Sequence, residues 1–484
     1  MSTPTSSAKL EASRKPQAAR ILEMPFELIS EIMQIGLLLT VPNRENNTGR
    51  MSYVTGLASV CTRFREIALE TPQLWVLEYF DILGYPLNAK TQRFLDRSKP
   101  CTFRVIITSP NGEDSDDEDY DSFSDEDEEP GNDGLSDMVA SGFGDTMDRW
   151  GEVVAIVHAP SELTDLAGLS PGYLTNLTKL HFELALMREQ PWKGPPLRLF
   201  SVAPRLSQAI IRLHKLSKPV SVLLPLPWAQ LKDLTIELDT LDSTFATLVL
   251  CQNLVSLSLA VLLTHAEIKF THPKITLPAL EKLDLHVLPI ATFGSLCPAL
   301  EALMLPALKR FEVEFGPEAW VSEQVATALE KFLTNNPSIT NLVVGNITDT
   351  PLLRILRCLP KLTELSIADN GLAEVIDDKL LQALSDGKLV PAVQSLELLS
   401  GTKKLKEPAL FRMISTRWQE DNGFAKLKRC RVEAEYLLND DFFAKIKALR
   451  DEGLVWEFEV KVPDLDSDEE NSEEDDYYRW ESYY

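Results

Sequence analysis

Hydrophobic residues between residues 20 and 80 recur at helical spacing in three consecutive groups. The first group follows Pro25, whose missing N–H suits the first turn of a helix, and comprises Leu28, Ile29, Ile32, Met33 and Ile35. The second group follows Ser52, a suitable N-cap, and comprises Val54, Leu57, Cys61, Phe64 and Ala68. Thr71-Pro72 starts a brief third helix. The pattern predicts a module of three short amphipathic helices.

The pattern changes after about residue 150, where the unit L-x-x-L-x-L recurs with substitutions at intervals of 20 to 39 residues. Each unit predicts a short strand that buries its central apolar pair, and helical patterns lie between units, as at 322–333, 352–359, 377–384 and 442–449. Units this small are stable only when stacked. Strands that alternate with helices predict right-handed crossovers and a parallel sheet, hence an α/β solenoid with helices on its convex face. The units are Leu177/Leu180/Phe182, Leu206/Ala209/Ile211, Leu231/Leu234/Ile236, Leu254/Leu257/Leu259, Leu280/Leu283/Leu285, Leu300/Leu303/Leu305, Ile339/Leu342/Val344, Leu362/Leu365/Ile367, Val393/Leu396/Leu398 and Leu427/Cys430/Val432.

Charge separates the folded parts from the rest of the chain. The net charge is −25, but residues 113–129 hold 12 acids and residues 464–484 hold 10 acids and one base, which leaves about −4 elsewhere. Acidic polar segments of this kind are typical of disorder. The predicted organisation is 1–19 disordered, 20–80 helical module, 81–110 start of the repeat domain, 111–148 acidic disordered insert, 149–462 repeat domain and 463–484 acidic disordered tail.

Composition also restricts partners and compartment. A body without excess basic charge argues against non-specific nucleic-acid or anionic-membrane binding. Six scattered cysteines without a Cys-x-x-Cys pair indicate reduced thiols, and therefore a cytoplasmic or nuclear location. The first nineteen residues lack the apolar segment of a secretory signal, and no apolar run is long enough to span a membrane.

The helical module resembles an F-box, which docks on the Skp adaptor of cullin-RING ubiquitin ligases. The resemblance depends on three motifs in order: Met24-Pro-x-Glu-Leu-Ile, Val60-Cys-x-x-Phe-Arg-x-Ile-Ala and Pro72-x-Leu-Trp. Two departures are Phe64, where the family usually has tryptophan, and a long polar loop over 41–51. A generic helical hairpin is the alternative reading. The resemblance implies that the adaptor-contact and packing positions are Met24, Pro25, Leu28, Ile32, Val60, Cys61 and Phe64.

The repeats are similar to leucine-rich repeats of a degenerate kind. Together with the module, their order along the chain resembles a fungal, mushroom-type F-box protein. The family implies a substrate adaptor, with ubiquitin transfer carried out by other subunits, and implies no cofactor or metal.

Motifs of catalysis do not occur in the sequence. There is no G-x-S-x-G, no Walker-type G-x-x-x-x-G-K and no G-x-G-x-x-G. His265 and His272 have no cysteine or carboxylate at metal-ligand spacing. The sequence therefore predicts a binding protein rather than an enzyme.

Two further surfaces are candidates for binding. Side chains alternate along a strand, so residues beside each buried pair are expected to line the concave face as a mixed polar strip without a dominant charge sign, suited to a protein substrate. They include His181, Asp233, Thr235, Glu237, Lys282, Asp284, His286, Glu364, Glu397, Arg429, Arg431 and Glu433. In the acidic segments, four serines directly before acidic runs are phosphorylation candidates: Ser115, Ser124, Ser467 and Ser472.

Two functional hypotheses follow. The first is a substrate-recognition subunit of a Skp–cullin–F-box ubiquitin ligase, with an unknown protein substrate. The second is a ligase-independent leucine-rich-repeat scaffold that binds basic proteins through its acidic segments, similar to the acidic leucine-rich nuclear phosphoproteins. The first would act by proximity, because tethering raises the effective concentration of the target near the transfer machinery.

Overall fold

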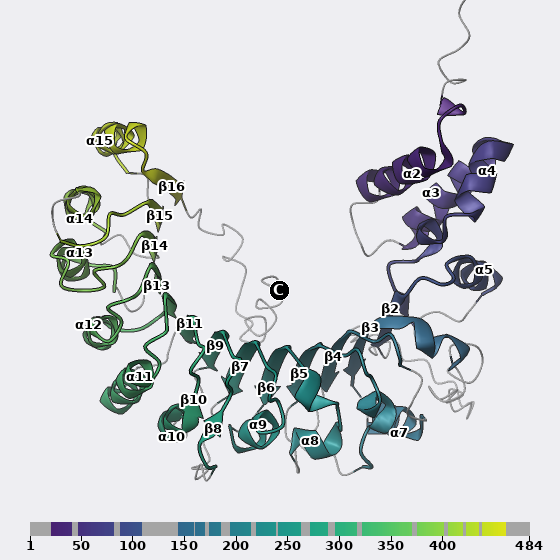
Figure 1. Ribbon diagram of the computed structural model, residues 1–484, viewed down its shortest axis with the longest axis horizontal. Coiled ribbons are helices and arrows are strands. Elements are labelled where there is room, and N and C mark those ends of the chain that lie inside the picture. The colour runs from purple at the N-terminus through teal and green to yellow at the C-terminus, as the bar shows by residue number, and fades with distance from the viewer. Residues whose placement is uncertain are drawn as a thin grey trace, which may run out of the picture. The chain divides into compact units, whose positions relative to one another are not determined.

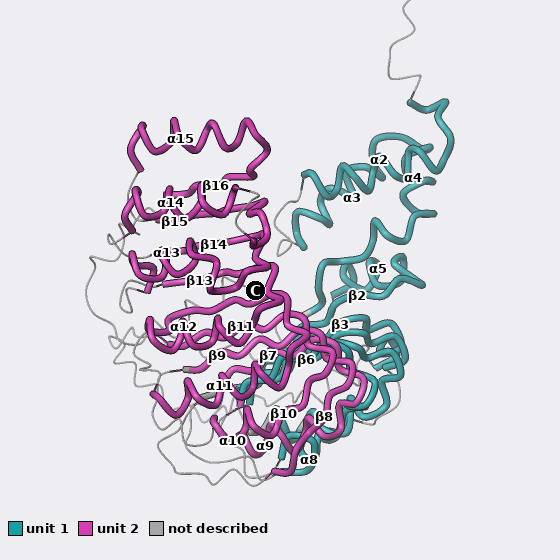
Figure 2. Tube along the Cα trace, turned by 60° about the vertical axis from the view of Figure 1, so that its left-hand side comes forward, with its two compact units in different colours: residues 1–237 teal, residues 238–484 magenta. Residues whose placement is uncertain are grey.

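The computed structural model describes residues 21–40, 47–81, 88–108, 144–158, 160–169, 174–184, 194–213, 219–238, 241–262, 272–288, 296–316, 322–369, 375–400, 405–419, 423–434 and 438–460. The chain divides into two compact units, residues 1–237 and residues 238–484, which Figure 2 shows in two colours. The helical module and the first repeats belong to unit 1. The remaining repeats form unit 2.

The helical module has four segments: α2 (Phe26–Thr40), α3 (Asn47–Val60), α4 (Thr62–Leu69) and the short 3-10 helix η1 (Pro72–Trp75). The second predicted helix is therefore wrong in two respects. It begins at Asn47, so residues 47–51 of the expected loop are helical, and it is interrupted at Cys61. Cys61 takes an extended backbone conformation, and its Sγ accepts a hydrogen bond from the Phe64 N–H at 3.4 Å. Cys61, which was predicted to lie within one continuous helix, is thus the N-cap of the separate helix α4.

Buried hydrogen bonds close this module. The Thr71 hydroxyl lies 3.0 Å from the Ser30 hydroxyl and 2.7 Å from the Ile67 carbonyl oxygen, so it joins α2, α4 and η1. The expected capping bond of Thr71 is not formed. The Trp75 indole N–H donates to the Ala68 carbonyl oxygen at 2.6 Å. The hydrogen bonds that these polar groups make inside the module offset the cost of removing them from water.

Aromatic and polar contacts join the module to the first strand and helix of the sheet. Helix α5 (Ala89–Arg97) places Phe94 against Trp75, with ring centroids 5.0 Å apart, and places the Arg97 guanidinium 4.4 Å from the Trp75 ring centroid. The Asn47 side chain donates to the Tyr79 carbonyl oxygen and accepts from the Glu78 N–H. These contacts therefore hold α3 and η1 against α5 and the residues that precede β1 within unit 1.

Unit 1 contains a parallel sheet in the order β1–β2–β3–β4–β5–β6. Its strands are β1 (Phe80–Asp81), β2 (Phe103–Thr108), β3 (Trp150–Val157), β4 (Lys179–Leu184), β5 (Gln208–Leu213) and β6 (Asp233–Leu238). Its short helices are η3 (Gly144–Arg149), α7 (Pro160–Gly168), η4 (Arg198–Ser201), α8 (Val220–Leu223) and η5 (Trp228–Gln230). Helix α5 and strand β2 lie within residues 81–110, where the start of the repeat domain was predicted. The acidic insert ends earlier than predicted, because η3 begins at Gly144 and buries Thr146 and Met147.

Unit 2 contains a parallel sheet in the order β7–β9–β11–β12–β13–β14–β15–β16. Its strands are β7 (Ser256–Leu262), β9 (Lys282–Leu288), β11 (Arg310–Phe315), β12 (Asn341–Gly345), β13 (Glu364–Asp369), β14 (Ser395–Ser400), β15 (Arg429–Ala434) and β16 (Val455–Val460). A separate parallel pair is β8 (Ile275–Thr276) with β10 (Leu303–Met304). The helices are α9 (Leu241–Leu248), α10 (Leu296–Ala302), α11 (Glu323–Asn335), α12 (Asp349–Arg357), α13 (Asp378–Ser385), α14 (Glu407–Trp418) and α15 (Asp440–Asp451).

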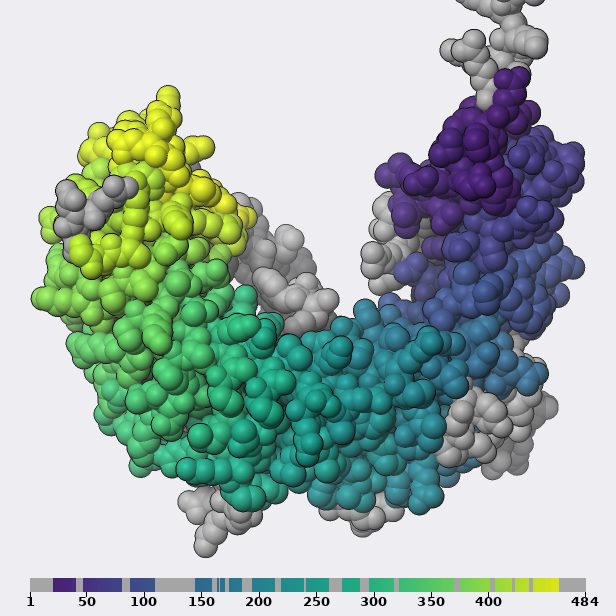
Figure 3. Space-filling view, viewed as in Figure 1, coloured from purple at the N-terminus to yellow at the C-terminus, as the bar shows by residue number. Residues whose placement is uncertain are grey.

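The leucine pattern explains the architecture of unit 2. Helices α11 to α15 lie on one side of its strands (Figure 1). The central apolar pair of each strand faces them; Leu342 and Val344 of β12, for example, are completely buried. Register alignment stacks equivalent positions, such as Leu283, Phe311, Leu342, Leu365 and Leu396. The colour in Figure 3 advances steadily through unit 2, as expected when each repeat packs on its sequence neighbours. The predicted parallel sheet with helices is confirmed.

One predicted repeat was placed wrongly. Leu300 lies in α10 and Leu303 in the short β10, whereas the sheet strand of that repeat is β11, with Phe311 and Val313 buried. The three-residue step from Leu300 to Leu303 fits one turn of a helix as well as the start of a repeat unit, so the leucine pattern alone predicted the wrong strand. The same spacing occurs at Leu308, Phe311 and Val313.

Candidate functional site

Helix α2 carries two apolar faces. Ile29, Met33 and Leu37 are at most 3% exposed and form the inner face. The outer face, here called the α2 stripe, comprises Leu28, Ile32, Ile35 and Leu39. Steps of four, three and four residues place them along one side of the helix, and these side chains are 45% to 76% exposed. A continuous row of exposed aliphatic side chains is a candidate interaction surface.

The other predicted adaptor positions are distributed around the module. Pro25 is exposed just before α2, and Val60 is 64% exposed at the end of α3. Met24, Cys61 and Phe64 are half-buried, and Cys61 also caps α4 as described above. Leu28 and Ile32 therefore belong to the α2 stripe, while Met24, Cys61 and Phe64 contribute partly to packing. The sequence prediction did not include Leu39 among the exposed positions of this helix, although its distance of four residues from Ile35 places it on the same side.

The second candidate surface is the open face of each sheet, defined as the face opposite the buried apolar pairs. In unit 1 this face carries the predicted residues His181 on β4 and Asp233, Thr235 and Glu237 on β6, all at half-buried positions of the alternating pattern. Arg212 on β5 lies between two carboxylates, with its guanidinium 3.3 Å from Glu183 and 3.5 Å from Glu237. Sequence reasoning missed Arg212.

The electrostatics of Glu183 follow from these neighbours. The hydrogen bond from His181 is the main factor that lowers the pKa of the Glu183 carboxyl, and Arg212 adds to it against the opposing effect of burial. Glu183 is therefore ionised throughout the neutral range. This part of the open face is a set of ion pairs around Glu183 rather than a reactive site.

In unit 2 the open face carries charged residues on β9, β11, β13, β14, β15 and β16. It carries the predicted residues Lys282, Asp284 and His286 on β9, Glu364 on β13, and Arg429 and Arg431 on β15. Arg431 forms ion pairs with Glu397 on one neighbouring strand at 2.7 Å and Glu459 on the other at 3.1 Å. Arg429 contacts both carboxylate oxygens of Glu457.

Acids outnumber bases on this face. The acids are Asp284, Glu312, Glu314, Glu364, Glu397, Glu433, Glu457 and Glu459, and the bases are Lys282, Arg310, Arg429 and Arg431. The prediction of a strip without a dominant charge sign is wrong for unit 2. Arg310, Glu312 and Glu314 were missed because the strand that carries them was assigned to the wrong leucines.

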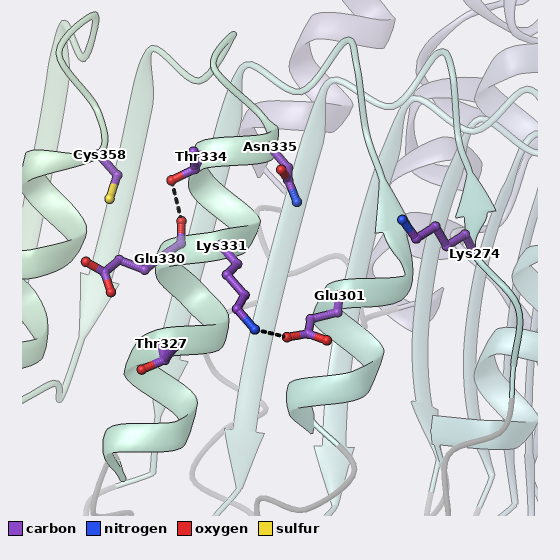
Figure 4. Close-up of a pocket in the computed structure, with 8 residues that line it drawn as sticks. All are labelled: Lys274, Glu301, Thr327, Glu330, Lys331, Thr334, Asn335 and Cys358. Atoms are coloured by element: carbon purple, nitrogen blue, oxygen red, sulfur yellow. Dashed lines mark hydrogen bonds and ion pairs between the residues drawn. The ribbon is translucent and has the colours of Figure 1, made fainter.

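A cavity of about 500 Å³ lies on the helical side of unit 2, lined by residues of α10, α11 and the end of α12 (Figure 4). Glu301 and Lys331 form an ion pair at 2.7 Å across it, and Glu330 pairs with Arg354. Burial raises the pKa of the Cys358 thiol, so this cysteine is protonated at neutral pH and is a poor nucleophile. The cavity therefore has paired charges and an unreactive thiol.

The buried cysteines behave alike. Burial raises the pKa of both Cys251 and Cys430 to about 12. Among the described residues, no group of histidines, cysteines and carboxylates has the arrangement of a metal site, and none of their helices is long and apolar enough to cross a bilayer. The phosphorylation candidates Ser115, Ser124, Ser467 and Ser472 lie outside the described residues.

Comparisons with known proteins add little to this picture. No protein-family model matches the chain, and no curated protein matches it. Among solved structures, one similar chain comes from the crystal structure of a TLR13–ssRNA13 complex, with 15% identity and a TM-score of 0.32. The match covers 64% of this chain and 45% of that chain.

Proposed function

We propose that the chain is a substrate-recognition subunit of a Skp–cullin–F-box ubiquitin ligase. Its helical module would dock on a Skp-type adaptor through the α2 stripe, and the open faces of its repeats would hold a protein target. The chain would then act by proximity: it would keep the target at high effective concentration near the subunits that transfer ubiquitin. The repeat architecture supports the protein-binding half of this proposal.

The observation that carries the docking half is the α2 stripe. Fully burying an aliphatic side chain of this size is worth about 1.5–3 kcal/mol, so leaving four of them in water is costly unless a partner covers them. The inner face of α2 already fills the core of the module with Ile29, Met33 and Leu37. The outer face therefore does not contribute to the core of the module. The three F-box-like motifs of the sequence favour a Skp-type adaptor as the partner that would cover it.

Co-purification with a fungal Skp adaptor tests the docking. The wild-type chain is compared with Leu28→Ser/Ile32→Ser, which removes apolar surface from the stripe without changing its charge. A matched control is Val222→Ser on α8, a side chain that is also 50% exposed but lies outside the module. We expect the wild-type and the control to retain the adaptor and the double variant to lose it. Equal retention by all three chains would refute the docking role.

The alternative function is a ligase-independent scaffold that binds basic proteins through the acidic segments. Its support is compositional, since residues 109–143 and 461–484 lie outside the described residues. Replacing the ten acids of residues 464–484 by amides separates the two functions. This change should leave adaptor binding intact, whereas it should abolish the binding of a basic protein if the scaffold hypothesis holds.

A further inference from the structure

The open face of β9 and β11 carries a cluster of carboxylates that the ion pairs of unit 2 leave incompletely satisfied. Asp284 lies directly opposite Glu312 in the register of the two strands, and His286 lies opposite Glu314. Like charges placed opposite each other across a strand pair destabilise a sheet. Asp284, Glu312 and Glu314 are here called the β9–β11 acidic cluster.

Asp284 supplies the second observation. The residue is only 7% exposed, and its Oδ2 lies 2.6 Å from the Lys282 ammonium nitrogen. Its other oxygen, Oδ1, is buried and has no hydrogen-bond partner among the described residues. An unsatisfied buried acceptor of this kind costs about 1–3 kcal/mol, more for a charged group. Because Oδ1 is closed to solvent, a cationic group on the open face could act on this carboxylate only through its charge.

The two neighbouring strands differ in the space that they leave beside the cluster. On β7, the residues opposite Lys282, Asp284 and His286 are Ser256, Ser258 and Ala260. On β12, the residue opposite Glu314 is Gly345, where even a Cβ atom would lie only 2.9 Å from the Glu314 side chain. Short side chains therefore flank the cluster on the β7 side, where an incoming cationic chain would meet no bulky group. On the β12 side the Glu314 side chain already packs against Gly345.

Charge decides which kind of group the cluster would bind. The bases nearest the cluster are already engaged: Lys282 with Asp284, and Arg310 with Glu312 at 3.0 Å. Among the described residues, the ion pair of Glu314 is with His286, at 3.4 Å. Over the whole open face of unit 2, eight carboxylates face four bases, as described above. This excess repels nucleic acid and favours a cationic side chain.

We propose that the β9–β11 acidic cluster binds a lysine or arginine side chain of an extended, basic segment of the target protein. The segment would lie along the open face of unit 2, where the remaining carboxylates attract its other basic residues. This inference rests on the proposed role of the repeats in binding a protein target and names the class of that target. It assigns recognition to the sheet rather than to the acidic insert or tail.

Fluorescence anisotropy with the full chain tests the inference. The probe is a fluorescent peptide of alternating lysine and glycine, with a glutamate–glycine peptide as the comparison. Glu312→Gln/Glu314→Gln removes two charges from the cluster and keeps the side-chain size. The matched control is Glu301→Gln/Glu330→Gln, which removes two ion-paired charges from the helical side of the same unit. A third chain has the ten tail acids replaced by amides.

We expect the lysine peptide to bind and the glutamate peptide not to bind. The cluster variant should lose about tenfold in affinity, which corresponds to about 1.4 kcal/mol, while the helical-side control and the tail variant stay closer to wild-type. Three results would overturn the proposal. The lysine peptide could fail to bind the wild-type chain, the cluster variant could lose less than about tenfold in affinity, or either of the other two chains could lose as much as the cluster variant. Adaptor co-purification of the same chains distinguishes this result from a failure of docking, because none of these substitutions touches the helical module.

Discussion

Helices α2 and α11 are both amphipathic, yet they use their apolar residues differently. In α11, Val325, Leu329, Phe332 and Leu333 all lie on the inner side and are at most 1% exposed. In α2, the inner residue Ile29 is 1% exposed while its neighbour Leu28 is 45% exposed. The apolar residues of α11 thus serve the fold alone, whereas α2 carries an additional set that the fold does not use. The difference separates a structural helix from one that carries the proposed docking surface.

The largest expected effect comes from the structural helix. Leu329→Ala in α11 removes a completely buried side chain between tightly packed neighbours. Such changes leave a cavity and cost about 3–5 kcal/mol. Urea unfolding followed by circular dichroism should show this decrease in the free energy of unfolding. A loss below about 1 kcal/mol would mean that α11 is packed no more tightly than a surface helix.

The adjacent pair on α2 gives the sharpest form of the comparison. Ile29→Ala should lower the stability of the module by about 2–3 kcal/mol, less than in α11, because a small module can collapse more readily around the cavity. Leu28→Ala, one residue away on the outer face, should change it by less than about 0.5 kcal/mol. Thermal unfolding followed by tryptophan fluorescence, for which Trp75 is the buried reporter in the module, measures both. Equal losses would show that Leu28 is a core residue and would remove the α2 stripe as a docking surface.

The sequence predicted the repeat architecture better than it predicted the surfaces. The units around Leu283, Leu342 and Leu365 coincide with observed strands, because an aliphatic pair in a short strand is a strong signal when it recurs. The unit at Leu300 failed because a three-residue step also fits a helix. The break at Cys61 was not predictable from periodicity, since the apolar stripe keeps its phase through it.

The exposed side of α2 illustrates a different limit. Hydrophobic periodicity shows which residues share a face but does not show whether that face is covered. The wide apolar surface of α2, from Leu28 to Leu39, could have been the mark of a central, fully buried helix. Only the packing of the neighbouring helices shows that Ile32 is outside. The strand β3 was missed for another reason: Trp150, Val153 and Ala155 lack the leucines that identified the other units.

Salt should distinguish the apolar α2 stripe from the charged open face of unit 2. Ionic strength screens interactions between exposed charges, while burial of aliphatic side chains is not weakened by screening. Raising sodium chloride from about 0.05 M to about 0.5 M should lower the affinity for the lysine–glycine peptide about tenfold. The same change should alter the affinity for the adaptor by less than about twofold. Titrations of the same chain with both ligands measure this. A salt-sensitive adaptor complex would show that α2 docks mainly through charge.

The smallest expected effect concerns His286, a histidine on the open face of unit 2, since imidazole groups ordinarily change charge near neutral pH. Burial disfavours its charged form, but the hydrogen bond and charge of Glu314, with Glu312 and Asp284, outweigh burial and raise the pKa of the imidazole above its ordinary value. A raised pKa in the folded state contributes stability below the unfolded-state pKa of about 6.5, and this contribution disappears as the pH rises through the folded-state pKa. His286→Gln should therefore destabilise unit 2 more at about pH 6 than at about pH 8, as urea unfolding at the two pH values would show. Glu314→Gln should lower the pKa of His286 and so reduce the pH dependence that this histidine gives to the stability of unit 2. A His286→Gln effect that does not change with pH would mean that the neighbouring carboxylates do not hold the imidazole in its charged form.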